Sequence, residues 1–175
     1  PAVQVGNPFL EKVLIEACLE VAREGLIEGM QDLGAAGLTS SVVEAAAKGG
    51  TGFELDVASV PRREEGMSAY EVMLSESQER MLLVVSPDGV DRVREVFAKW
   101  EVTCRQIGSV EQEPQALVWD GASLVAQLPV NELVEAPRYR LQGRQPPEQR
   151  QRQRLALSGV PLPAEGPSGT LLKLL

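Results

Sequence analysis

The sequence has 175 residues and a formal net charge of −8, with 43% hydrophobic and only 4% aromatic residues. One domain of ordinary size with a packed core fits this length, and an acidic chain with few aromatic residues is a poor nucleic-acid surface. The absence of His excludes Ser–His and Cys–His catalytic pairs and His-containing zinc sites, so any bound metal would be a hard cation held by carboxylates.

The first predicted element is a long amphipathic helix. Apolar pairs recur every four residues over residues 9–24, which predicts a helix that begins near Pro8 and ends at Gly25. Ile15 and Leu19 fall outside the main apolar stripe. We therefore expect this helix to be covered on two sides, by its own sheet and by another layer.

A short strand over residues 26–30 is predicted next, followed by a second helix. Ser41 and Glu44 have the spacing of a capping box, and Gly49-Gly50 predicts the end of the helix. The glycines and hydroxyl groups before this helix are compatible with a phosphate at its start. The segment lacks the Lys of a P-loop and the glycine spacing of a dinucleotide site, so this signal is weak.

The centre of the sequence combines two strands, a short helix and a polar turn. Residues 51–57 alternate as a strand does, and Ser68 with Glu71 has the capping-box pattern of a short helix. Residues 75–80 connect that helix to the apolar run 81–85, which predicts a buried strand. Such a turn presents hydroxyl, amide and carboxylate groups that can bind a polar ligand, although the local pattern also fits an ordinary solvated turn.

A helix and three strands are predicted in the following segment. The helix spans residues 86–100, and the strands span residues 102–110, 115–119 and 122–128. Asp120-Gly121 is a signal for a two-residue hairpin between the last two strands. The elements together predict an α+β fold, in which helices pack on a mostly antiparallel sheet that closes with a hairpin meander.

The periodicity stops beyond Ala136. Residues 138–175 carry seven basic side chains against two glutamates, a net charge of +5, so that residues 1–137 carry −13. Scattered prolines and a Gln/Arg run predict a linker or disordered tail, although its arginines are also suited to polyanions. We therefore predict one domain over residues 1–137 and a largely irregular Arg/Pro-rich linker over residues 138–175.

Cysteine usage and hydropathy indicate the compartment. Cys18 and Cys104 lie in apolar surroundings, which indicates two small core residues and not a disulfide framework. The sequence has no apolar run long enough to span a membrane and no signal peptide. We expect a cytoplasmic protein without membrane or nucleic-acid partners. The first residue is Pro and not Met, which is typical of a processed or excised piece.

Three stretches occur in the order and spacing of one family. They are VQVGNPFLEK at residues 3–12, QDLGAAGLTSS at residues 31–41, and REEGM at residues 63–67 through SESQERM at residues 75–81. These stretches resemble the family of phosphoribosylformylglycinamidine synthase subunit II, in the first of its two domains similar to the C-terminal domain of aminoimidazole ribonucleotide (AIR) synthase. The resemblance covers roughly residues 3–140.

The resemblance implies part of an ATP-dependent carbon–nitrogen ligase of de novo purine biosynthesis. In the family's reaction, ATP phosphorylates the amide oxygen of formylglycinamide ribonucleotide, and ammonia from glutamine displaces the phosphate. Such chemistry depends on positioning and on charge neutralisation by Mg²⁺. The implied partners are a glutaminase subunit, a small accessory subunit, an upstream ATP-binding domain that makes most of the contacts to ATP, and a second repeat. The family's catalytic His lies upstream, so we expect no catalytic residue here and no activity from this piece alone.

Five positions match the family's substrate and metal contacts. Gln4 and the triplet Glu76, Ser77 and Gln78 are implied contacts to the ribonucleotide substrate, and Asp32 is an implied Mg²⁺ ligand. The two glutamines offer both a donor and an acceptor to an amide substrate. A lone carboxylate such as Asp32 can hold Mg²⁺ together with waters and substrate phosphates. The alternative interpretations are a turn glutamine, a capping aspartate and a solvated loop.

Some residues and some rival functions stay outside this assignment. Asn7 stands where the resemblance leads us to expect Asp, and it still caps a helix but lacks the charge. We expect Glu79 and Arg80 to make structural pairs and not to contact substrate. The rival functions are a non-enzymatic binding or assembly module, and a domain of a related ATP-dependent enzyme such as selenophosphate synthase or thiamine-monophosphate kinase. The turn at residues 75–80 argues against those relatives.

Overall fold

The computed structural model describes residues 6–62, 64–135, 139–154, 159, 164 and 166–173. The chain divides into two compact units, Pro1–Ala136 and Pro137–Leu175, and each is described by itself. Among the described residues there is no helix with the length and hydropathy that crossing a bilayer requires.

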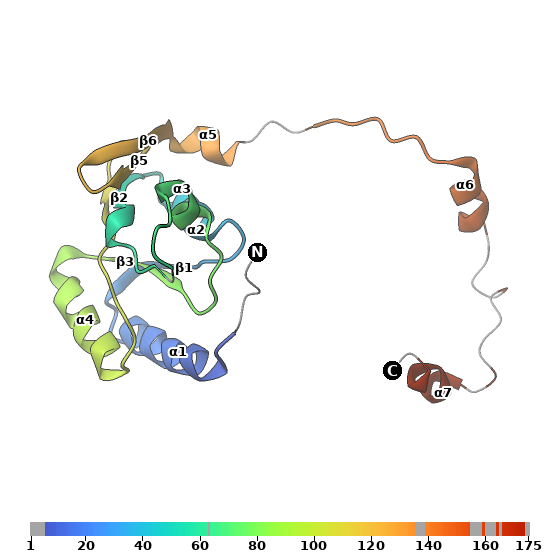
Figure 1. Ribbon diagram of the computed structural model, residues 1–175, viewed down its shortest axis with the longest axis horizontal. Helices are drawn as coiled ribbons and strands as arrows, with labels where there is room; N and C mark the ends of the chain where they lie inside the picture. Colours follow the sequence, from blue (N-terminus) through green and yellow to red (C-terminus); the bar gives the residue numbers. More distant parts are fainter. Residues whose placement is uncertain are drawn as a thin grey trace. The chain divides into compact units, whose positions relative to one another are not determined.

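Helices and strands alternate along the first unit as far as α4, after which three strands follow one another (Figure 1). In chain order they are α1 (Pro8–Arg23), β1 (Ile27–Asp32), α2 (Gly37–Gly49), β2 (Gly52–Asp56), the 3-10 helix η1 (Val57–Ser59), α3 (Ala69–Leu74), β3 (Met81–Val85), the 3-10 helix η2 (Pro87–Gly89), α4 (Val90–Lys99), β4 (Gly108–Glu111), β5 (Gln115–Asp120), β6 (Ser123–Pro129) and α5 (Val130–Val134). The predicted strand over residues 102–110 is therefore shorter and begins later.

The strands form two sheets. β1 and β3 make an antiparallel ribbon, and the other sheet has the order β4-β2-β5-β6. In that sheet β2 runs antiparallel to β4 and parallel to β5, while β5 and β6 are antiparallel. The predicted mostly antiparallel α+β fold is confirmed. The predicted meander is wrong, because β2 lies between β4 and β5 and brings residues from much earlier in the chain into the sheet.

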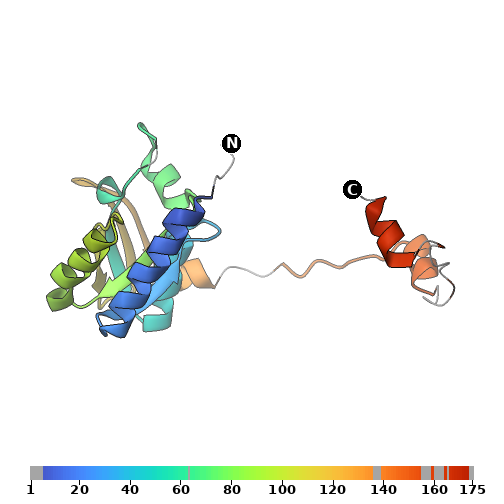
Figure 2. The same cartoon turned by 90° about the horizontal axis from the view of Figure 1, so that it is seen from below.

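Two hydrophobic clusters lie on opposite sides of the β1–β3 ribbon. One joins α1 and α4 through Val21 and Val96, with Leu83 of β3 packed against it. The other joins α2 to the four-stranded sheet through Leu38, with Leu82 of β3 packed against it. Neighbouring residues of β3 thus face opposite layers, as a strand requires. Figure 2 shows α1 and α4 side by side on one face of the unit.

Strand β3 and helix α1 differ from expectation in burial. Every residue of β3 is half-buried and not buried, and its one partner strand is β1. Ile15 and Leu19 on α1 are 47% and 41% exposed. The predicted second cover over α1 is therefore not found in the described part of the chain.

Helix α2 begins five residues earlier than predicted, because a capping box at Ser41 would make Ser41 the N-cap. Its N-cap is Ala36 and its first residue is Gly37, so Ser41 lies inside the helix. The Ser41 hydroxyl donates to the carbonyl oxygens of Gly37 and Leu38. The predicted capping box at Ser41 is therefore wrong. The end of the helix agrees with prediction, since Gly50 adopts a left-handed conformation with φ of 66°.

Two short-range motifs follow the sequence closely. Ser68 and Glu71 form the predicted capping box at the start of α3. Asp120 pairs with Ser123, so β5 and β6 are joined by a two-residue hairpin in which Gly121 has a φ of 60°. The hairpin signal is thus confirmed, with the loop one residue later than the dipeptide indicated.

The described residues of the second unit include two short helices. They are α6 (Pro147–Gln153) and α7 (Gly166–Leu172), in a segment predicted to be largely irregular. Pro147 occupies the first helical position, which suits a residue without an N–H donor. A side-chain bond from Gln145 Nε2 to Gln153 Oε1 of 2.7 Å spans α6.

Candidate functional site

A cavity of about 330 Å³ opens beside residues 75–80, which connect α3 to β3 and are called here the polar turn. Ser75 and residues 77–80 line this turn cavity, together with Asn7 at the start of α1 and residues 60–62 after η1. The volume lies at the lower end of the range for small-molecule sites. Three segments distant in sequence therefore meet around one space.

The side chain of Arg80 stabilises the polar turn from within. The Arg80 guanidinium donates to the carbonyl oxygens of Ser75 and of Ser77, the latter at 3.3 Å. The hydroxyl groups of these two serines are 3.4 Å apart. Burial lowers the pKa of Arg80, and Glu79 has a left-handed backbone with φ of 56°. Hydrogen bonds within the polar turn thus define its conformation.

The polar turn also packs against the start of α2. The Glu76 carboxylate accepts a hydrogen bond of 3.1 Å from the backbone N–H of Ala36. The next residue, Gly37, has a φ of 54°, and a Cβ at this position would overlap the carbonyl oxygen of Ser75. Only Gly meets both conditions without strain. Gly37, the first residue of α2, therefore permits the close approach of the polar turn.

A second contact links the polar turn to α1. The Glu79 carboxylate accepts a hydrogen bond of 2.7 Å from the backbone N–H of Asn7. Asn7 Oδ1 in turn accepts from the N–H of Leu10 and caps the helix. Glu79 and Arg80 both make structural contacts, as expected, but with different parts of the chain, and both also line the turn cavity.

Asp32 lies at the end of β1, next to the polar turn. It pairs with Met81 at the start of β3, and the following N–H, of Leu33, donates to the carbonyl of Arg80 at 3.4 Å. The exposed Asp32 carboxylate accepts a bond of 3.3 Å from Gln31 Nε2. The described residues contain no group of three or more side chains suited to a metal ion. A cation held at Asp32, the predicted Mg²⁺ ligand, would therefore need waters and ligand oxygens to complete its coordination.

The predicted site residues differ in how they relate to the turn cavity. Ser77 and Gln78 line it. Glu76 faces the start of α2, and Asp32 lies at the end of the neighbouring strand, so both flank the cavity without lining it. Gln4 lies outside the described residues.

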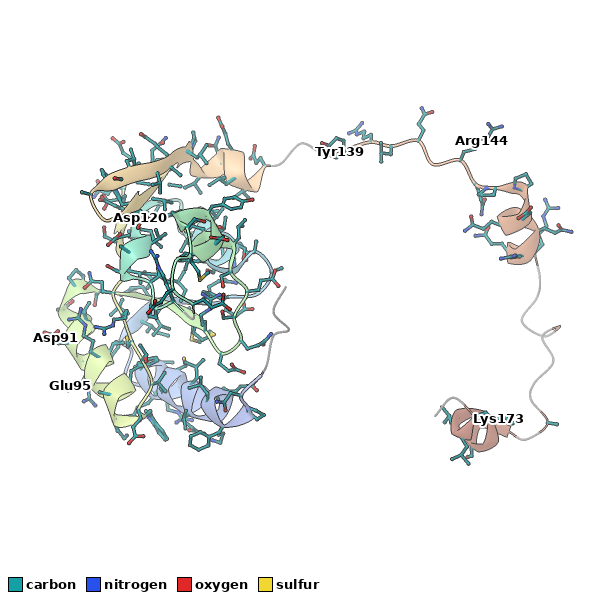
Figure 3. The ribbon with its side chains drawn as sticks, viewed as in Figure 1. Asp91, Glu95, Asp120, Tyr139, Arg144 and Lys173 are labelled. Carbon is teal, nitrogen blue, oxygen red and sulfur yellow. The ribbon has the colours of Figure 1, made fainter. Side chains whose placement is uncertain are left out.

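Arg62 is a cavity residue that the sequence did not single out. Its guanidinium donates to the carbonyl oxygens of Met67 at 2.9 Å and Val57 at 3.3 Å. Arg62 Nη2 is 3.6 Å from Asp120 Oδ1, at the end of β5 (Figure 3). The side chain is 28% exposed. In the sequence Arg62 belongs to a charged connection, and nothing local distinguishes it from the other charges there.

A second hollow of about 620 Å³ lies beside the four-stranded sheet, with Glu54, Arg94 and Trp119 among its lining residues. Asp56 in this hollow already accepts from the backbone N–H of Gly121, a bond that lowers the pKa of the carboxyl. None of the predicted site residues lines this hollow. The turn cavity is therefore the stronger candidate site.

Comparison with known proteins relates most of the chain to one family. Residues 1–120 match the family model described as AIR synthase related protein, C-terminal domain. The chain is 56% identical over 160 residues to phosphoribosylformylglycinamidine synthase subunit PurL of Thermomicrobium roseum. The aligned residues make up 91% of this chain and 22% of that protein. It is 50% identical over 169 residues to the PurL subunit of Moorella thermoacetica, over 94% of this chain and 23% of that protein. The chain thus spans less than a quarter of the length of these curated relatives.

Solved structures show the same similarity. Thermotoga maritima PurL complexed with FGAR is 42% identical with a TM-score of 0.75, over 82% of this chain and 24% of that chain. The same protein complexed with ATP gives the same identity and TM-score over 82% and 25%. The structure of PurLQS from the same organism is also 42% identical to this chain with a TM-score of 0.75, over 83% of this chain and 25% of that chain.

Proposed function

The chain belongs to the family of AIR synthase related proteins, as a C-terminal domain, and we propose that it forms the ribonucleotide-binding part of an ATP-dependent carbon–nitrogen ligase. The complete reaction would convert formylglycinamide ribonucleotide, ATP and glutamine-derived ammonia into formylglycinamidine ribonucleotide. The similarity to PurL subunits supports this reaction. The observation that carries the proposal is the turn cavity, which is lined by both Ser77 and Gln78.

In this proposal the chain's own residues bind and orient the substrate. Gln78 exchanges a donor and an acceptor with the amide to be converted, and Ser77 donates to a ribose or phosphate oxygen. Glu76 accepts from ribose hydroxyls while one of its oxygens holds the N–H of Ala36. A carboxylate has about four lone-pair sites, so both tasks are compatible. Fixed orientation of the substrate amide is a recognised source of rate acceleration.

Gln4 and Asp32 are proposed to complete the site from two sides. Gln4 precedes Asn7 by three residues, and the Asn7 N–H is held at the turn cavity by Glu79. Three residues span at most roughly 10 Å, which is short enough for Gln4 to act in the same site as the residues of the turn cavity. Asp32 would bind Mg²⁺ together with ligand phosphate oxygens and waters. The cation would neutralise charge on the transferred phosphoryl group.

The rest of the site is proposed to come from other polypeptide. We assign most of the ATP contacts to an ATP-binding domain, and the ammonia supply to a glutaminase subunit with a small accessory subunit. The ATP complex and the PurLQS structure of Thermotoga maritima support these assignments. The chain by itself would then be inactive, and the complete enzyme would be cytoplasmic.

The kinetic test uses the full-length protein that contains this chain. Gln78→Ala and Gln4→Ala should each lower kcat/KM for formylglycinamide ribonucleotide about tenfold or more, because each removes a hydrogen-bonding partner of the bound substrate. Gln112→Ala, in the exposed connection between β4 and β5, is the matched control and should leave kcat/KM unchanged. Wild-type kinetics in both site variants, or formation of no amidine product by the wild-type protein, would overturn the proposed function.

A further inference from the structure

We propose that the turn cavity contains an oxyanion subsite, in which the guanidinium groups of Arg62 and Arg80 bind a phosphate group of the ligand. The subsite deepens the proposed function, on which it rests for the identity of the natural ligand. Its chemistry is nevertheless testable with simple phosphates.

The two guanidinium groups reach the cavity from different segments. Arg62 follows η1 and donates to the backbone carbonyls of Met67 and Val57, whereas Arg80 donates to two carbonyls within the polar turn. Each guanidinium has about five N–H donors in a planar fork, and these backbone bonds use two of them. The bonds hold both groups in place, so a ligand anion does not have to order them.

The charge of the cavity lining is opposite to that of the body. Residues 1–137 carry a net charge of −13, yet the lining of the turn cavity has two arginines and one carboxylate, that of Glu79. That carboxylate already accepts the N–H of Asn7. Asp120 Oδ1 lies 3.6 Å from Arg62 Nη2, an ion pair longer than a normal hydrogen bond that offsets part of the Arg62 charge. The cavity lining itself still carries more positive than negative charge within an otherwise acidic body, which favours a ligand anion.

Neutral donors beside the arginines favour phosphate over carboxylate. The hydroxyls of Ser75 and Ser77 lie 3.4 Å apart, and both residues line the cavity. Two guanidinium groups and a hydroxyl match the three terminal oxygens of a phosphate monoester, while a carboxylate has two oxygens and is satisfied by one arginine. The volume of about 330 Å³ leaves room for a sugar next to the phosphate.

The binding test uses the isotope-labelled 175-residue chain and NMR. The chain is titrated with inorganic phosphate, ribose 5-phosphate, ribose and acetate, and the backbone signals of residues 60–62 and 75–80 are followed. Phosphate and ribose 5-phosphate should shift these signals, whereas ribose and acetate at equal concentration should not. Equal shifts from ribose, equal shifts from acetate, or none from either phosphate would each overturn the subsite.

Variants assign the binding to Arg62. Arg62→Gln should weaken the binding of ribose 5-phosphate about tenfold or more, since a charge-assisted contact is lost. Arg94→Gln is the matched control on α4, where Arg94 contacts Asp91 and Gln106, and it should leave binding unchanged. Equal weakening by both substitutions would show a general charge effect and contradict the proposal.

Two further measurements keep the proposal independent of folding and of the proposed function. In the wild-type chain, ribose 5-phosphate should bind more tightly as the pH rises through the second phosphate pKa near ~6, because the dianion forms, and flat binding would contradict the subsite. Retained phosphate binding without turnover of formylglycinamide ribonucleotide by the full-length protein would contradict only the proposed function. Turnover by full-length protein whose Arg62→Gln variant is fully active would contradict only the subsite.

Discussion

The Glu79 carboxylate accepts the backbone N–H of Asn7 at 2.7 Å and so joins residues 72 positions apart in sequence. The start of α1 is thereby attached to the polar turn. Two of the three stretches that resemble the ligase family, residues 3–12 and 75–81, meet at this bond, and the third, residues 31–41, holds the turn through Ala36 and Gly37. The family signature is therefore one structural unit.

Removing the Glu79 acceptor should loosen the start of α1. We predict that Glu79→Ala increases hydrogen exchange at the Asn7 and Leu10 amides and lowers the free energy of unfolding by about 0.5–1 kcal/mol, the usual net value of one hydrogen bond. Glu79→Gln keeps an acceptor oxygen and should stay close to wild type. Equal exchange in all three proteins would show that the bond does not hold the helix start.

A side chain at Gly37 should displace the polar turn. Gly37→Ala places a Cβ against the Ser75 carbonyl oxygen in a left-handed conformation, whereas Gly50→Ala has the same backbone strain with open space around it. We predict a loss of about 1 kcal/mol for Gly50→Ala and at least ~2 kcal/mol for Gly37→Ala in urea denaturation. Equal losses of unfolding free energy in the two variants would mean that the close approach of the turn does not affect stability.

Local motifs were predictable from sequence, because residues a few positions apart determine them. The capping box of Ser68 and Glu71 and the strand at residues 81–85 are examples. The capping-box spacing at Ser41 misled, because the start of α2 is set by the approach of Ser75 to Gly37, two segments distant in sequence.

Contacts between distant segments were not predictable from local patterns. The insertion of β2 between β4 and β5 depends on which strands bury their apolar faces together, and periodicity within one strand does not encode this. Arg62 is the corresponding case in the site. Its neighbours in sequence are charged and exposed, and its place in the cavity follows from contacts with Val57 and Met67. The resemblance pointed to Ser77 and Gln78, which line the cavity, but it did not point to Arg62.

The contacts between α1 and α4 should make stability depend on acid pH. Glu20 accepts from Lys99 Nζ and Trp100 Nε1, and Arg92 donates twice to Glu24. These bonds lower the pKa of Glu20, chiefly through Lys99, and that of Glu24, chiefly through Arg92. A carboxyl group whose pKa is lower in the folded protein than in the unfolded chain stabilises the fold at pH values above its pKa in the unfolded chain. This contribution is lost as the pH falls through its pKa in the folded protein.

We therefore predict that the urea midpoint falls as the pH drops from about 6 to about 3, across the unfolded glutamate pKa of ~4.3. The double substitution Glu20→Gln and Glu24→Gln should reduce this dependence. Glu28→Gln removes an exposed carboxylate from β1 and should not. A double variant with the wild-type pH profile would refute the role of these contacts. Asp91 and Glu95 lie on the outward side of α4 (Figure 3).

The two thiols should be unreactive in the folded chain. Burial raises the pKa of Cys18, with a smaller contribution from Cys104, and burial also raises the pKa of Cys104. At about pH 8 both would be mostly protonated, and the thiolate is the reactive form. We predict negligible iodoacetamide labelling of either cysteine in buffer and labelling of both in urea, measured by mass spectrometry. Rapid labelling of Cys18 in buffer would contradict its burial between α1 and α4.

The most direct test of the site is a crystal structure of the full-length protein with formylglycinamide ribonucleotide bound. We predict ligand atoms within about 3.5 Å of Ser77 Oγ and of the Gln78 side-chain amide, a hydrogen-bonding distance, with the ribonucleotide occupying the turn cavity. A ligand bound on another face of the domain, with the turn cavity empty, would contradict it.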